Sequence, residues 1–510
     1  MKARFFAIAL LLPGFLTAET PLSAIDWLDE QRLGPATEPS QKQTKPVEPP
    51  VSLSGNRPDI EVSTLSEIQS DSVGLLPPSV TGFPLTMWHN SSTIDLVTLL
   101  NSLPVSHNPA IQSLTLRVLL AEGDAPSDSE GKFAFFAARL KKLIDYGAID
   151  PALALVERAA PLPAPLVPLL FDLSLLSDTL QPACDQVLQL GPSYPHDDAR
   201  IYCLARRGDW LTATLMLEAT SALGTISARK TALIHLFLEN QAYDTLALQL
   251  PPSTAPTPLE FRLYEAIGEP LAATSLPRAF AVSDLSGEHG WKAQLQAAER
   301  LIEFGALGDN RFLGIYTDNE PAASGGIWDR ISVVQKLDKA LLEENKPAIG
   351  LHLIKAWNLL GATPLAPPIS RIFSARLLSA DLNEDAAQLA GKIALLSPSY
   401  ETAAAMISPK SDQDAFLVSI AKGDFSDYSP KSEFEKTIQD AFDDPRVPYS
   451  VNQLMGQGKL GEIILNAMIQ FEKGAEGDLQ DLLEALSTLR LIGLEDTARR
   501  ATLALVLLAN

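Results

Sequence analysis

Apolar residues recur at helical spacing almost everywhere from Ser91 onward, and this pattern limits what the chain can fold into. Two such stripes are Trp291, Leu295, Ala298, Ile302 and Ile349, Leu353, Ala356, Leu360. Pro347 suits the first turn of the helix that carries the second stripe, and Asp478 is expected to cap a further helix over 479–489 that ends at Gly493. No Asn-Gly or Asp-Gly turn lies between alternating runs, so strands are not indicated. The sequence predicts an all-α protein.

The predicted helices come in pairs, separated by breaks that contain Gly, Asp or Asn. The pairs are 140–146 with 151–158, 199–205 with 211–223, 233–239 with 242–250, 301–304 with 309–316, 377–383 with 385–396, and 489–491 with 494–508. One helical hairpin cannot bury its own apolar face, so such pairs are expected to stack. We therefore predict a right-handed α-solenoid-like array of antiparallel helical hairpins, in two helical-repeat domains over 91–290 and 291–510.

The N-terminal segment has the composition of an export signal. Positive charges at Lys2 and Arg4 precede an apolar run from Phe5 to Leu16, and Ala18 is a small residue suited to the position before cleavage. The apolar run has about 12 residues, fewer than a membrane-spanning helix needs. We predict a signal peptide over 1–18 that directs the chain to the periplasm or to secretion, and no transmembrane segment in the mature chain.

Residues 34–59 are rich in Pro, Gln, Thr and Lys, so they cannot bury a core and are predicted to be a disordered linker. Residues 60–90 carry short extended runs without clear period and are predicted to wrap the first helices. The linker would tether a short motif over 19–33. Within that motif, a helix capped by Ser23 would present four apolar residues, Leu22, Ile25, Trp27 and Leu28. Three interpretations stay open: docking on a partner, docking in the chain's own groove, and disorder.

Cys184 and Cys203 lie on either side of a turn over 191–195. An antiparallel hairpin would bring them level, and an oxidising compartment permits a disulfide between them. Two separate buried thiols are the alternative. The cysteines are not spaced as C-x-x-C, so a redox-active site is not indicated.

The search for chemistry finds no nucleophile elbow, P-loop, zinc-protease or calcium-loop motif, and six scattered histidines have no metal-ligand spacing. No catalytic residue, metal site or cofactor is predicted. Ser324, Gly325 and Gly326 precede a predicted helix, where free N–H groups would suit an anion. A loop that needs glycine for its backbone conformation is the alternative. The net charge of −22 argues against a nucleic-acid partner.

Two resemblances add to this picture. The run from Cys203 to Trp210, followed by Ala213 and Leu217, resembles degenerate tetratricopeptide-type repeats. Three segments, 21–28, 323–330 and 494–500, resemble an uncharacterised family of exported alphaproteobacterial proteins. The first resemblance implies a helical-repeat fold, and the second implies no activity.

Two classes of function follow. The first is a periplasmic binding or scaffold protein that contacts other cell-envelope proteins. The second is a cell-wall-active hydrolase, or a regulator of a peptidoglycan enzyme, with an unrecognised site. An enzyme should show a pocket with convergent polar groups, whereas a scaffold should show a broad binding surface.

Overall fold

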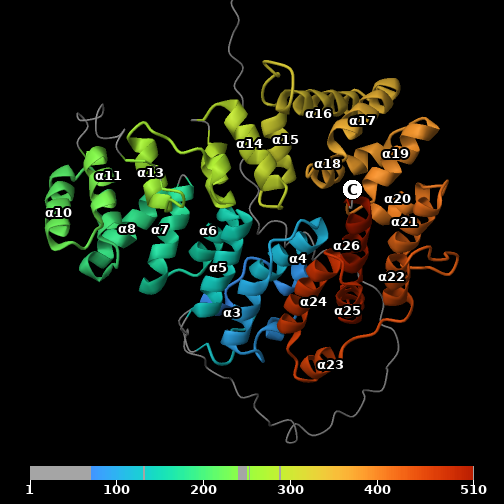
Figure 1. Cartoon of the computed structure of the whole chain (residues 1–510), viewed down its shortest axis with the longest axis horizontal. Coiled ribbons are helices and arrows are strands. Elements are labelled where there is room, and N and C mark those ends of the chain that lie inside the picture. The colour runs from blue at the N-terminus through green and yellow to red at the C-terminus, as the bar shows by residue number, and fades with distance from the viewer. Residues whose placement is uncertain are drawn as a thin grey trace, which may run out of the picture. The chain divides into compact units, whose positions relative to one another are not determined.

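The computed structural model describes residues 70–129, 133–177, 179–238, 250–251, 253–286 and 289–508 (Figure 1). All of them belong to one compact unit, Ser66–Asn510. The described residues form helices and no strand; Leu76 and Ala121 make an isolated parallel bridge. The predicted all-α class is confirmed.

The described elements up to residue 238 are η2 (Ser70–Ser72), α2 (Pro78–Thr81), η3 (Leu85–Met87), α3 (Thr93–Ser102), α4 (Pro109–Leu120), α5 (Ala134–Tyr146), α6 (Ile149–Arg158), η4 (Ala164–Leu166), α7 (Val167–Leu176), α8 (Leu180–Leu190), η5 (Gly191–Ser193), α9 (Asp197–Arg206), α10 (Trp210–Leu223) and α11 (Ala228–Leu238). The described elements from residue 250 onward are α13 (Pro258–Ala266), η7 (Ala273–Ser275), η8 (Arg278–Leu285), α14 (Trp291–Ile302), α15 (Asp309–Thr317), α16 (Ile327–Leu342), α17 (Lys346–Leu360), α18 (Ala366–Ser379), α19 (Glu384–Ala394), α20 (Tyr400–Met406), α21 (Asp412–Lys422), α22 (Glu433–Asp443), α23 (Tyr449–Gly456), α24 (Leu460–Ala475), α25 (Leu479–Leu491) and α26 (Glu495–Leu508).

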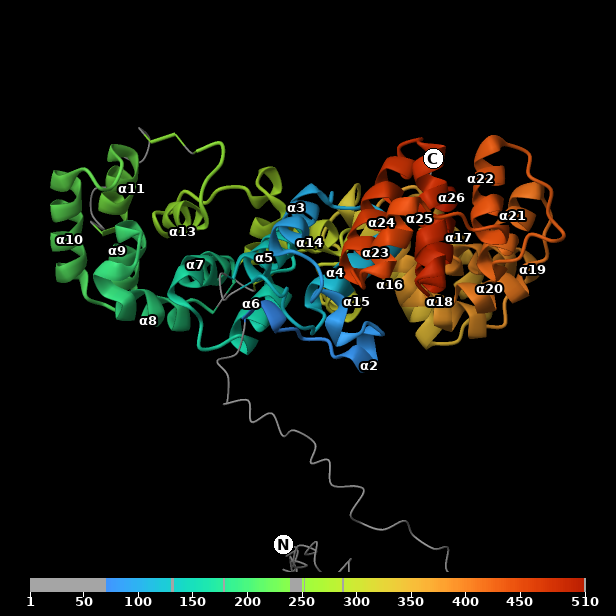
Figure 2. The same cartoon turned by 90° about the horizontal axis from the view of Figure 1, so that it is seen from below.

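Helices that follow one another pack as pairs, among them α9 with α10, α16 with α17, α18 with α19 and α24 with α25 (Figure 2). The predicted signals are present: Pro347 lies in the first turn of α17, and the Asp478 carboxylate accepts from the N–H groups of Gln480 and Asp481. Most of the predicted helix over 242–250 lies outside the described residues. The solenoid arrangement and its handedness stay predictions.

Two large groups of apolar side chains form separate cores. One contains buried residues from Ala281 to Ile393, and the other contains residues from both sides of this segment, including Val73 and Leu503. The core that contains Val73 and Leu503 forms because α3 packs on α24 and α4 packs on α26. In Figure 1 these helices, blue and red, lie side by side. The predicted domain division at residue 291 stays a prediction.

Polar contacts fasten the same two ends of the described unit. Asn108 caps α4 through its side-chain oxygen, while its Nδ2 donates to the carbonyl of Ala501 at 2.9 Å. Ser106 Oγ donates to Glu472 Oε1 at 2.5 Å. Burial raises the pKa of the Glu472 carboxyl, although this hydrogen bond opposes the rise. The N-terminal end of α4 is therefore completed by residues from α24 and α26.

The segment over 60–90 is described from residue 70 onward, where short helical turns alternate with extended residues. Arg139 of α5, which is completely buried, holds it in place. Its guanidinium donates to the carbonyls of Val73 at 2.8 Å and Leu119 at 2.9 Å, and burial lowers its pKa to about 10. A buried cation is tolerated here because backbone carbonyls replace its water.

Candidate functional site

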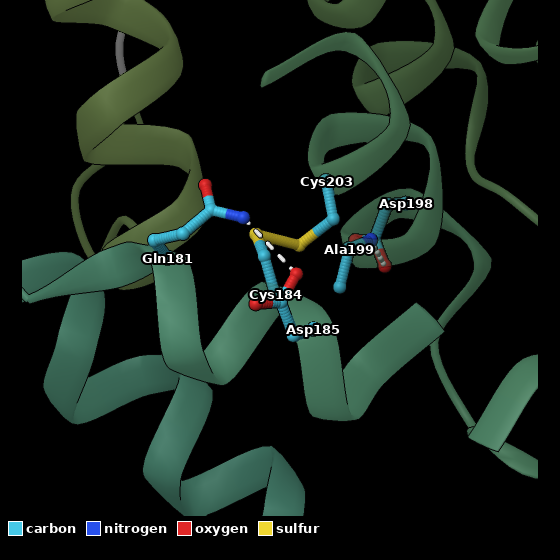
Figure 3. The surroundings of a disulfide bond; sticks show 6 residues. All are labelled: Gln181, Cys184, Asp185, Asp198, Ala199 and Cys203. Atoms are coloured by element: carbon cyan, nitrogen blue, oxygen red, sulfur yellow. Dashed lines mark hydrogen bonds between the residues drawn. A yellow bond between two sulfur atoms is a disulfide. The ribbon is translucent and has the colours of Figure 1, made fainter. Parts of the chain in front are cut away.

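The two cysteines lie at bonding distance, with 5.2 Å between their Cα atoms (Figure 3). Cys184 is on α8 and Cys203 on α9, the two helices that flank the predicted turn. Both side chains are buried. The cysteine pair therefore forms the predicted disulfide, and it fastens a helical hairpin that contains no residue of the cavities described below.

The loop before α16 has the features expected of a loop that needs glycine for its backbone conformation. Gly325 and Gly326 both have positive φ angles, 93° and 57°, which only glycine adopts readily. The Gly325 N–H already donates to the Asp329 carboxylate at 3.0 Å. An external anion at Ser324–Gly326 would have to compete with this carboxylate, and the anion site stays a prediction. Leu22, Ile25, Trp27 and Leu28 lie outside the described residues.

A cavity of about 240 Å³ opens where four distant segments meet. Its wall comprises the N-terminal end of α4, the residues after α14, the turn from α17 into α18, and the end of α26. His107 and Glu303 lie next to each other in this wall, with 3.5 Å between Nδ1 and Oε1, and the imidazole packs edge-on against Phe304. The Glu303 carbonyl accepts from Gln112 Nε2 of α4 at 2.9 Å, so the backbone of this wall is fixed.

A second cavity of about 430 Å³ shares Glu303, Thr363 and Pro364 with the first. Among its charged lining residues is Glu299, whose carboxylate accepts two hydrogen bonds from the Arg330 guanidinium, at 2.8 and 2.7 Å, and one from the Tyr316 hydroxyl. Burial and the neighbouring carboxylate raise the pKa of Tyr316, and the hydrogen bond to Glu299 raises that of Arg330. Glu299 is thus already fully engaged, which suits a structural anchor better than a proton carrier.

One helix exposes apolar side chains that no described neighbour covers. On α10, Ala213, Leu217 and Thr220 are buried against α9 and α11, yet Leu211, Leu215 and Leu223 are 73%, 62% and 77% exposed. Trp210 at the start of the helix is half exposed, and its ring lies against Phe237 of α11 with 5.9 Å between the centroids. A helix that is apolar on both sides is normally buried on both sides. We call Leu211, Leu215 and Leu223 the α10 face.

The sequence predicted neither the two cavities nor the α10 face. The α10 face had a signal, since 210–223 contains few charges; an amphipathic helix would place some opposite Ala213 and Leu217. The cavities had none, because His107, Glu303 and Thr363 come together only through tertiary packing.

No family model, no curated protein and no solved structure matches the chain. Within the described residues, no helix combines the length and apolarity needed to cross a membrane, and no group of His, Cys, Asp and Glu side chains is arranged to hold a metal ion.

Proposed function

We propose that the chain is an exported helical-repeat protein of the periplasm that binds another cell-envelope protein through the α10 face. The observation that carries the proposal is the apolar surface of α10 opposite its buried side. Exposing such side chains to water costs about 25 cal/mol per Å² of apolar area. A complementary apolar surface on a partner would recover that free energy.

Three further observations support the proposal. Trp is enriched among the residues that contribute most to binding at protein interfaces, and the half-exposed Trp210 directly precedes Leu211 in α10. The disulfide between Cys184 and Cys203 suits an oxidising compartment. The same bond fixes the hairpin from which α10 continues, so the α10 face sits on a rigid support.

The interface is tested by placing a photo-crosslinking amino acid at Leu215 in the full chain, expressed in its native periplasm. Ile94, on α3, is the matched control because it is an isolated apolar residue that is 74% exposed. We expect a discrete adduct of one partner mass from Leu215 and none from Ile94. The same adducts at both positions, or no adduct at Leu215, would contradict the proposal. An adduct of twice the chain's mass would replace the partner with a second copy.

Export is tested separately by sequencing the N-terminus of the mature chain. We expect cleavage near Ala18 and recovery from the periplasmic fraction. A full-length chain retained in the cytoplasm would overturn this part of the proposal.

A further inference from the structure

A third cavity, of about 480 Å³, is lined by α4 along much of its length and contains no residue of the α10 face. Its volume falls within the range of about 300–1,000 Å³ that small-molecule sites occupy. Apolar side chains, among them Leu76, Val80 and Leu120, form one part of the wall. Arginines from three different helices form another part: Arg117 of α4, Arg371 of α18 and Arg500 of α26.

The three guanidinium groups are not equally neutralised. Arg371 makes a fork on Asp309, at 2.8 and 3.2 Å, and Arg500 reaches Asp496 at 3.5 Å. Arg117 has no hydrogen bond or ion pair to any described residue; its guanidinium lies over the Phe83 ring, 5.2 Å from the centroid. The Arg117 Nε is buried and has no hydrogen-bond acceptor.

The surroundings of Arg117 disfavour its charge. Burial lowers its pKa, Asp496 partly opposes the effect, and the like charge of Arg500 adds to it. An unpaired, partly desolvated cation is costly, and an external anion would remove that cost. The lining contains three arginines and one aspartate, which is notable in a chain whose net charge is −22.

We propose that this cavity binds a small amphiphilic anion. A carboxylate or phosphate group would lie between Arg117 and Arg500, because the planar guanidinium fork matches the geometry of both groups. An aliphatic portion would lie against Leu76, Val80 and Leu120, where an inorganic ion would leave the apolar wall empty. Arg371, held by Asp309, forms the fixed side of the site.

The test measures binding to the full mature chain by calorimetry, with octyl phosphate, inorganic phosphate and octanol as separate probes at constant ionic strength. We expect octyl phosphate to bind about tenfold or more tightly than inorganic phosphate, since burial of several methylene groups adds to the affinity. Octanol should not bind measurably. Equal affinity for the two phosphates would overturn the amphiphilic assignment, and the absence of any phosphate binding would overturn the site.

The residue assignment is tested with Arg117→Met, which keeps the length of the side chain and removes its charge. We expect octyl phosphate to bind about tenfold more weakly, the loss typical of a charge-assisted hydrogen bond. Without ligand, the variant should melt at or above the wild-type temperature, because the buried Nε has no acceptor to lose. Arg446→Met, at an exposed arginine, is the control and should bind like wild type. A folded Arg117→Met variant with unchanged affinity would refute the assignment. Crosslinking from Leu215 is independent of either result.

Discussion

The indole ring of Trp88 lies directly against the Cα of Gly461. A Cβ built on this glycine would come within 2.2 Å of ring atom Cε3, closer than any real contact. Trp88 is itself almost completely buried and packs edge-on against Phe135 of α5. One residue without a side chain, inside α24, thus permits the contact between the two ends of the described unit.

Replacing this glycine should therefore be costly. Gly461→Ala is expected to lower the free energy of unfolding by about 1–3 kcal/mol, because the methyl group forces Trp88 out of its position. Gly456→Ala is the matched control: Gly456 is likewise a helical glycine, the last residue of α23, and a Cβ there meets nothing within 4 Å. That variant should be neutral or slightly more stable. Thermal or urea unfolding monitored by circular dichroism compares them, and equal stabilities would show that Trp88 can move freely.

Removing the disulfide should destabilise the helical hairpin. The two cysteines are 19 residues apart, and a closed loop of this size stabilises a fold by about 3 kcal/mol through the entropy of the unfolded chain. The Cys184→Ser/Cys203→Ser double variant should melt below the wild type. Adding a reductant should lower the melting temperature of the wild type alone. A reductant effect of the same size on the double variant would point to a cause other than this bond.

Stability should depend on pH through Asp172 of α7. Burial raises the pKa of its carboxyl from 3.8 to about 6, while His196 opposes the rise. Because the folded state holds this proton more tightly than the unfolded state, the free energy of unfolding falls as pH rises from about 4 to about 6. Asp172→Asn cannot ionise, so its stability relative to wild type should increase across this range. Urea titrations of both proteins at pH 4.5 and 7.5 measure it. A constant difference would mean that Asp172 titrates normally in the fold.

Glu299 should matter more for stability than an exposed carboxylate. Glu299→Gln removes the charge that Arg330 and Tyr316 both contact, and we expect a loss of about 2–3 kcal/mol, since Arg330 would stay partly buried without its partner. Asp444→Asn disrupts the exposed pair with Arg446, which water screens, and should leave stability close to that of the wild type. Melting temperatures distinguish the two, and a neutral Glu299→Gln would show that water replaces the carboxylate.

The local features of this fold were readable from the sequence. The apolar stripe that starts at Trp291 predicted α14, and Asp478 predicted the start of α25, because both signals act within a few residues. The disulfide was predictable for the same reason, since Cys184 and Cys203 flank one turn. Each prediction needed only helix geometry.

The sequence contains no comparable local signal for the contacts that form the cavities. Asn108 and Ala501 are 393 positions apart, and nothing in either neighbourhood identifies the other. Arg117, Arg371 and Arg500 look in sequence like ordinary surface arginines, and only the packing of α4, α18 and α26 places them around one cavity. The unpaired Nε of Arg117 is a property of that packing, so no pattern of residues could indicate it.

The contacts of α3 and α4 with α24 and α26 also determine when this core can form during protein synthesis. A ribosome makes α3 and α4 long before their packing partners, so their shared core must form late. Until α26 emerges, the apolar sides of both helices have only local neighbours, and the carbonyl that receives the Asn108 amide does not yet exist. Such non-local pairing slows folding. An interrupted chain would therefore present the same surfaces to chaperones and proteases that the finished chain conceals.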